Sequence, residues 1–132
     1  MFRKIGQYEI KAEGDLIFVW SSPLFNLEVA QEYGAAMAEL IRSMPPKFAI
    51  LAQFDEPPII GPEVEAAMRE GAKYRAQRGL VAVAFVTADH HGQAIASGQW
   101  NRIYDPNGIP FAFFDKIENA RAWLRGKIDK AF

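Results

Sequence analysis

A buried strand that leads through a proline-containing loop into a helix is the most constraining feature of this chain. It lies in residues 47–63, which read KFAILAQFDEPPIIGPE. Phe48–Ala52 is an unbroken apolar run, so both faces of the predicted strand need cover, as in an interior strand of a sheet. The strand should end before Pro57, because proline cannot donate a hydrogen bond to a neighbouring strand, and Pro62 suits the first position of a helix. In an open α/β sheet, such a junction is where ligands bind.

Strand and helix patterns alternate on both sides of this stretch. Strands Tyr8–Ala12 and Leu16–Trp20 are predicted to form a hairpin, because a Glu-Gly-Asp turn separates them. The further predicted elements are a helix from the N-cap Asn26 to about Met44, the strand of the central stretch, a helix Pro62–Arg78 that Gly79 ends, a strand Leu80–Ala88, a helix Gln93–Tyr104, a strand Pro110–Phe114 and a last helix with Asp115 as N-cap and Glu118 completing a capping box.

This order is β-β-α-β-α-β-α-β-α, which predicts an α/β fold with a mainly parallel five-stranded sheet. The first hairpin adds an antiparallel strand at the N-terminal edge. We expect residues 1–132 to form a single domain, since no linker, repeat or low-complexity segment interrupts the pattern.

Composition excludes several classes of function. The net charge of −1 gives no electrostatic reason to expect nucleic-acid binding, which usually requires a basic stripe. The absence of cysteine excludes disulfides and thiol chemistry. No apolar run reaches the roughly 18 residues of a membrane-spanning helix, and the N-terminus has no signal-peptide pattern. We therefore expect a cytoplasmic protein without a transmembrane segment and without a cofactor.

Charged side chains follow the two most apolar strands. Asp55 and Glu56 end the first, and Asp89, His90 and His91 follow the second. If these strands are adjacent and parallel, the side chains share one edge and could form an acid/base or metal site. The simpler hypothesis is two polar loops, because the adjacent histidines lack the spacing of metalloprotease ligands. We therefore predict neither a catalytic residue nor a metal site here.

An apolar pair, Ile59 and Ile60, interrupts the first of these loops, just before Gly61. The pair could pack across the helix start, or it could contact a protein partner or a small apolar ligand. Gly61 could hold an anion at the helix N-terminus, but the acidic neighbours argue against it. Together these residues define a predicted binding rim for a ligand or partner: Asp55, Glu56, Ile59, Ile60, Gly61, Asp89, His90 and His91.

Both faces of the sheet are predicted to need cover. Leu80–Ala88 is apolar at both parities apart from Thr87, and Phe111, Phe113 and Phe114 also point to both faces. If all helices lay on one face, other elements or a second copy of the chain would have to cover the other. We therefore expect a homodimer.

The closing segment, residues 111–124, reads FAFFDKIENARAWL and resembles the corresponding segment of the SpoIIAA-like (STAS-like) family. Anti-sigma-factor antagonists share the fold of this family. The resemblance implies a sheet in sequential strand order with helices mainly on one side, and a regulatory or binding role. The antagonists carry a phosphorylatable serine at the start of the helix after the central strand. Residues 55–62, DEPPIIGP, contain no serine or threonine, so a phosphorylation switch is not expected.

Three function hypotheses follow. The first is a non-catalytic regulatory or protein-interaction domain of the STAS-like kind. The second is a carrier of a small molecule or lipid, and the third is a small enzyme that uses His90 or His91 with Asp55 or Glu56. A deep apolar pocket would favour the carrier, a histidine–carboxylate pair in a cleft the enzyme, and a flat rim with exposed Ile59 and Ile60 the interaction domain.

Overall fold

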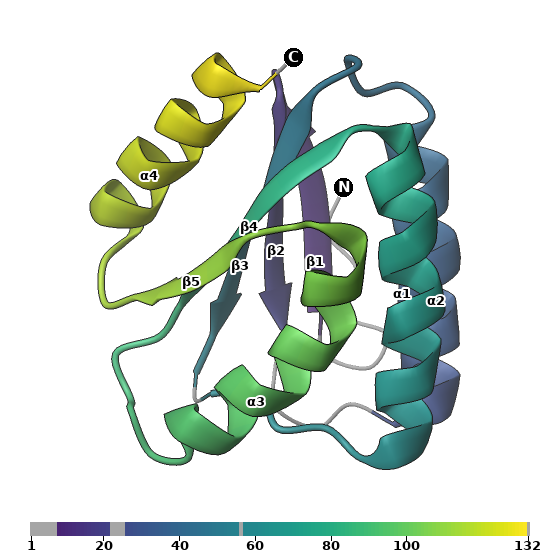
Figure 1. Ribbon diagram of the computed structural model, residues 1–132. Coiled ribbons are helices and arrows are strands. Elements are labelled where there is room, and N and C mark those ends of the chain that lie inside the picture. The colour runs from purple at the N-terminus through teal and green to yellow at the C-terminus, as the bar shows by residue number, and fades with distance from the viewer. Residues whose placement is uncertain (1–7, 22–25, 56, 132) are drawn as a thin grey trace.

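The computed structural model, which describes residues 8–21, 26–55 and 57–131, has one five-stranded sheet with helices on both faces (Figure 1). The strands lie in sequential order, with β1 antiparallel to β2 and every other pair parallel. The elements are β1 (Tyr8–Glu13), β2 (Leu16–Ser21), α1 (Leu27–Ile41), β3 (Phe48–Phe54), α2 (Pro62–Arg78), β4 (Leu80–Val86), α3 (Gln93–Tyr104), β5 (Phe111–Phe114) and α4 (Ile117–Lys130). The predicted α/β layout with an antiparallel N-terminal edge strand is confirmed.

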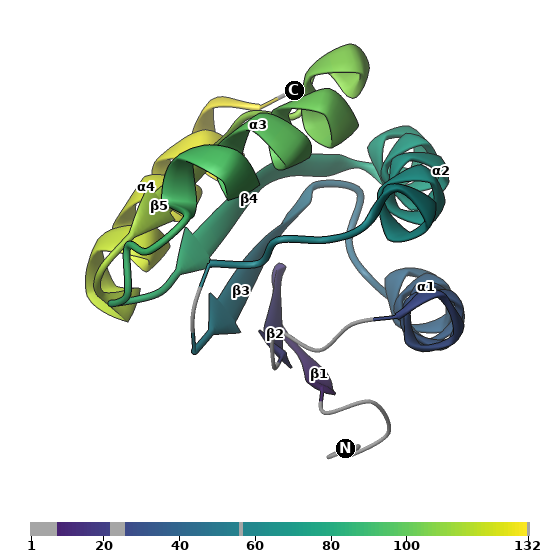
Figure 2. The ribbon, with the colours of Figure 1, turned by 90° about the horizontal axis from the view of Figure 1, so that it is seen from below.

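Two apolar layers cover the sheet, one on each face. Figure 2 shows α1, α2 and α3 on one side of the strands and α4 on the other. Ile50 and Val83 belong to the core beneath the first three helices, whereas Leu51 and Ala84 belong to the core beneath α4. This alternation follows from the period of two in a strand, which sends successive side chains to opposite faces.

The helix α4 supplies the cover that the second face of the sheet needs. Ala120, Leu124 and Ile128 on α4 pack against apolar side chains of β2, β3 and β4. An element of the chain itself therefore explains the two-sided apolar pattern of Leu80–Ala88, and this pattern gives no reason to invoke a second copy. A homodimer remains a prediction.

Local signals fixed most element ends. The Asn26 side chain accepts a hydrogen bond from the Val29 amide at 2.8 Å and begins α1, as predicted. Gly79 ends α2 with a left-handed φ of 111°. A Cβ at this position would lie 1.8 Å from the Pro46 carbonyl oxygen, so only glycine fits between α2 and the start of β3.

Several predicted boundaries were wrong, and those of three strands differ by one residue, since β1 ends at Glu13, β2 ends at Ser21 and β5 begins at Phe111. The helix α1 ends at Ile41 rather than Met44, since the residue before Pro45 is disfavoured in the helical region and the last turn tightens. The strand β4 ends at Val86 rather than Ala88. The predicted capping box does not form, because Lys116 is the N-cap of α4 and makes no side-chain cap bond.

Candidate functional site

The loops of the predicted rim follow strands that end at one edge of the sheet, while the role of the rim in binding stays a prediction. Since β3, β4 and β5 are parallel neighbours, their carboxyl ends meet there, and Asp55, Asp89 and Asp115 follow them. Asp55, Asp89 and Gly61 are exposed. Glu56 lies outside the described residues. The predicted juxtaposition of the two loops along one edge is therefore correct for the described members.

The histidines of this edge contact aspartates other than Asp55, and contacts with Glu56 lie outside the described residues. His90 Nε2 lies 2.5 Å from Asp115 Oδ1, while the His91 amide donates to Asp89 Oδ1 at 2.9 Å. Within residues 8–21, 26–55 and 57–131, neither histidine bonds Asp55, and no group of three or more metal-ligating side chains occurs. Asp115 accepts from His90 instead of capping α4. Both side chains are more than half exposed, so the pair lies on the surface and not in a cleft.

One residue of the apolar pair in the rim is buried, and the other is partly exposed to solvent. The side chain of Ile60 is buried, while Ile59 is 45 % exposed and lies against Gly92 at the start of α3. The segment 57–61 crosses the helix side of the sheet as a strap, and α3 holds it. Trp100 Nε1 donates to the Pro58 carbonyl at 2.8 Å, and the Gln99 amide both accepts from the Ile60 N–H and donates to its carbonyl, at 2.8 and 2.6 Å.

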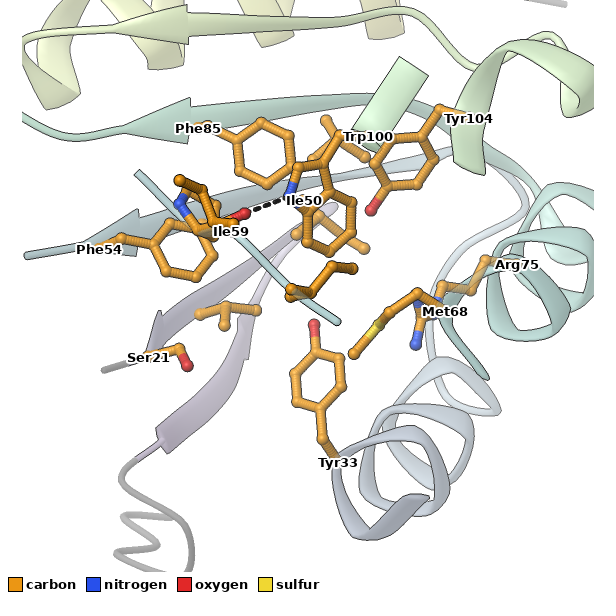
Figure 3. Close-up of a pocket in the computed structure, with 15 residues that line it drawn as sticks. Ser21, Tyr33, Ile50, Phe54, Ile59, Met68, Arg75, Phe85, Trp100 and Tyr104 are labelled. Atoms are coloured by element: carbon orange, nitrogen blue, oxygen red, sulfur yellow. Dashed lines mark hydrogen bonds between the residues drawn. The ribbon is translucent and has the colours of Figure 1, made fainter. Parts of the chain in front are cut away.

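A small pocket of about 40 Å³ lies beneath this strap. It lies between the helix-covered face of β2, β3 and β4 and the helices α1, α2 and α3 (Figure 3). Segments from most of the chain therefore contribute to its lining. The lining residues are Val19, Ser21, Tyr33, Ile50, Ala52, Phe54, Pro58, Ile59, Ile60, Met68, Arg75, Val83, Phe85, Trp100 and Tyr104. Most of these side chains are apolar or aromatic, as is typical of ligand pockets.

Three polar side chains interrupt this apolar lining on the helix side. Arg75 of α2 is only 3 % exposed, and its Cζ lies 5.6 Å from the centre of the Tyr33 ring. Figure 3 shows the hydroxyl groups of Tyr33 and Tyr104 pointing into the pocket from α1 and α3, with Arg75 beside Met68. The pocket therefore combines a large apolar wall with one cation and two hydroxyl groups.

The two hydroxyl groups stay protonated at neutral pH. Burial raises the pKa of Tyr33 above its ordinary value of 10.0, although the positive charge of Arg75 opposes the rise. Burial raises the pKa of Tyr104 in the same way, again against the effect of Arg75. Both groups are consequently neutral hydrogen-bond donors toward the pocket.

A second buried charge, Glu65, belongs to the scaffold and not to the pocket. Its carboxylate accepts hydrogen bonds from Arg102 of α3 at 2.9 and 2.7 Å and from Arg69 at 3.1 Å. Hydrogen bonding and attraction to Arg102 lower the pKa of Glu65, despite partial desolvation. Glu65 thus links α2 to α3 and fixes the spacing of the two helices that border the pocket.

Two residues of the strap belong to the predicted rim, whereas the cation of the pocket does not. Ile59 and Ile60 were part of the predicted rim, while Arg75, Tyr33 and Tyr104 were not. Arg75 lies four residues after Gly71 and seven after Met68, on the apolar side of α2, and this position was the available signal. No family model, curated protein or solved structure matches this chain, so its function must be inferred from the geometry of the site.

Proposed function

We propose that this chain is a non-catalytic binding domain of the STAS-like kind that holds a small, mainly apolar molecule in the pocket beneath the strap. The observation that supports this most directly is the pocket itself, since a buried, mostly apolar space with few polar groups is the usual form of a small-molecule site. The sequential strand order agrees with what the resemblance to STAS-like domains implies.

The size of the pocket restricts the ligand. A space of about 40 Å³ accommodates a few water molecules or a compact organic group, whereas drug-sized ligands occupy roughly 300–1,000 Å³. A ligand larger than this space, such as one with a six-carbon chain, would have to displace the exposed Ile59 side chain, which covers the pocket without being fully packed. We therefore favour a short ligand over a lipid with long chains.

A protein-interaction role is the second candidate, and exposed apolar side chains favour it. Ile59 and Ile95 are the large hydrophobic residues that the described chain exposes most, at 45 % and 61 %. Ile59 lies on the strap and Ile95 in the first turn of α3, to which the strap is bound. A ligand beneath the strap would thus alter a surface that a partner could contact.

Native mass spectrometry of the purified protein tests the proposal first, because a retained small molecule and the oligomeric state appear in one spectrum. A titration with hexan-1-ol and with hexanoate, followed by tryptophan fluorescence, then tests an empty protein. We expect saturable binding of at least one probe with a stoichiometry of one. The binding should change the tryptophan fluorescence, because Trp100 lines the pocket.

Two variants make this experiment specific. Ala52→Leu adds volume to a buried wall of the pocket and should abolish binding, at a stability cost of about 1–3 kcal/mol. His90→Ala, a matched control on the exposed rim, should leave binding unchanged. Absence of any retained molecule, together with no saturable binding of either probe, would reject the proposal.

A further inference from the structure

Arg75 differs from the ion-paired arginines in how deeply it is buried and in whether a carboxylate contacts it. Arg69, Arg102 and Arg125 are about half exposed, and each lies within 3.1 Å of a carboxylate oxygen. Arg75 is almost fully buried, yet in the described part of the chain it forms no hydrogen bond and no ion pair. An arginine cannot lose its proton in a protein, so the described part of the chain contains a buried cation without a counter-ion.

The surroundings of Arg75 hold the guanidinium group in place without neutralising it. The ring of Tyr33 lies under the group at cation–π distance. Gly71, one helical turn earlier, is also close, since a Cβ there would lie 3.1 Å from Arg75 Nη2. Glycine inside a helix costs about 1 kcal/mol relative to alanine, so α2 gives up some helix propensity at the point where the guanidinium group needs space.

We propose that Arg75 binds the carboxylate of a small apolar monocarboxylate in the pocket, with the Tyr33 and Tyr104 hydroxyl groups as the neighbouring donors. This inference rests on the proposed function and specifies its ligand. A guanidinium group presents parallel N–H donors that match a carboxylate, and such charge-assisted bonds are about twice as strong as neutral ones. The bound anion supplies the counter-ion that residues 8–21, 26–55 and 57–131 do not.

The remaining lining excludes more highly charged anions. The pocket contributes one cation, and apart from Ser21 and the two hydroxyl groups its side chains are apolar. A phosphate dianion would leave one charge and several oxygens buried without partners, which is costly. A carboxylate with a short hydrocarbon body satisfies Arg75 and places its apolar part against Phe85, Trp100 and Val83.

The test compares hexanoate with hexan-1-ol, which has the same chain length and no charge, by isothermal titration calorimetry. Wild-type protein should bind hexanoate about 30-fold more tightly than the alcohol, the ratio expected for one charge-assisted interaction. Arg75→Met, which keeps the volume of the side chain, should remove this preference and leave binding of the alcohol within about twofold. Arg78→Met, on the exposed side of the same helix, is the matched control and should behave as wild type.

Each outcome separates the inference from the proposed function. If the alcohol binds as well as hexanoate and Arg75→Met changes neither affinity, the carboxylate assignment is wrong and the apolar pocket stands. If neither probe binds and no small molecule is retained, the function itself fails. Inorganic phosphate should not compete with hexanoate at equal concentration, and competition through Arg75 would overturn the monocarboxylate class.

A second variant keeps the inference testable if Arg75→Met does not fold. Arg75→Lys retains the charge but loses the planar pair of donors, so it should weaken hexanoate binding about 10-fold and preserve a preference over the alcohol. Tyr104→Phe removes one donor and should weaken hexanoate without affecting the alcohol. Unchanged hexanoate affinity in both variants would contradict the assignment.

Discussion

The two faces of the sheet solve the same packing problem with different side chains. Beneath α4, the strands present the fully buried residues Ala49, Ala82 and Ala84, and this small-residue surface allows the helix to lie close. On the other face, the Phe85 ring is surrounded by Phe54, Trp100, Tyr104, Phe111 and Phe113, with ring centres 5.1 to 6.4 Å away. The pocket lies on this aromatic face.

The arginines of the two faces also differ, in whether a carboxylate pairs with them. Arg125 of α4 binds Asp15, in the turn between β1 and β2, with two hydrogen bonds of 3.0 and 2.7 Å. Arg75 on the aromatic face has no carboxylate partner among the described residues. The comparison fits our proposal that the aromatic face keeps space and charge available for a ligand, while the α4 face contributes to stability.

The largest expected effect tests the packing of the α4 face. Leu124→Ala should lower the free energy of unfolding by about 3 kcal/mol, because the side chain is fully buried and the sheet beneath it cannot collapse into the gap. Ile59→Ala on the strap should cost less than about 1 kcal/mol, since Ile59 is half exposed. Urea denaturation of both variants measures the difference, and equal losses would refute the contrast between the two faces.

An intermediate effect of opposite sign concerns Arg75. In the absence of ligand, Arg75→Met should raise the free energy of unfolding by about 1–2 kcal/mol, because it removes a buried charge that has no counter-ion among the described residues. Thermal and urea unfolding of ligand-free protein measure the change, with Arg78→Met as the control for loss of a positive charge. A destabilisation of more than about 1 kcal/mol would mean that the folded state needs the charge of Arg75.

The smallest effect concerns the paired arginine of the α4 face. Hydrogen bonding to Arg125 lowers the pKa of Asp15 below its ordinary value of 3.8, so the pair stabilises the folded state above that pH. Asp15→Asn should therefore cost about 0.5–1 kcal/mol at pH 7. The difference from wild type should disappear as the pH falls through the lowered pKa, since the carboxylate becomes protonated. A constant difference down to pH 2 would contradict the ion pair as its cause.

The sequence determined the framework of this protein, because the signals that fix its elements act over a few residues. The two-sided apolar pattern of Phe48–Phe54, the side-chain cap of Asn26 and the left-handed Gly79 each specified an element or its end. The shared edge of β3 and β4 follows from the predicted parallel pairing, so the sequence alone indicates that the loops after these two strands lie along one edge.

The tertiary structure alone decided where the pocket and its buried charge lie. Asp115 lies close to His90 only because β4 and β5 are adjacent, and the strap covers the sheet only because Gln99 and Trp100 of α3 hold it. Whether a helical arginine reaches water or is buried beside Tyr33 depends on how α1 and α2 pack, which local sequence does not encode. The pocket and its charge arise from contacts between residues far apart in the chain, and for this reason they became visible only in the folded protein.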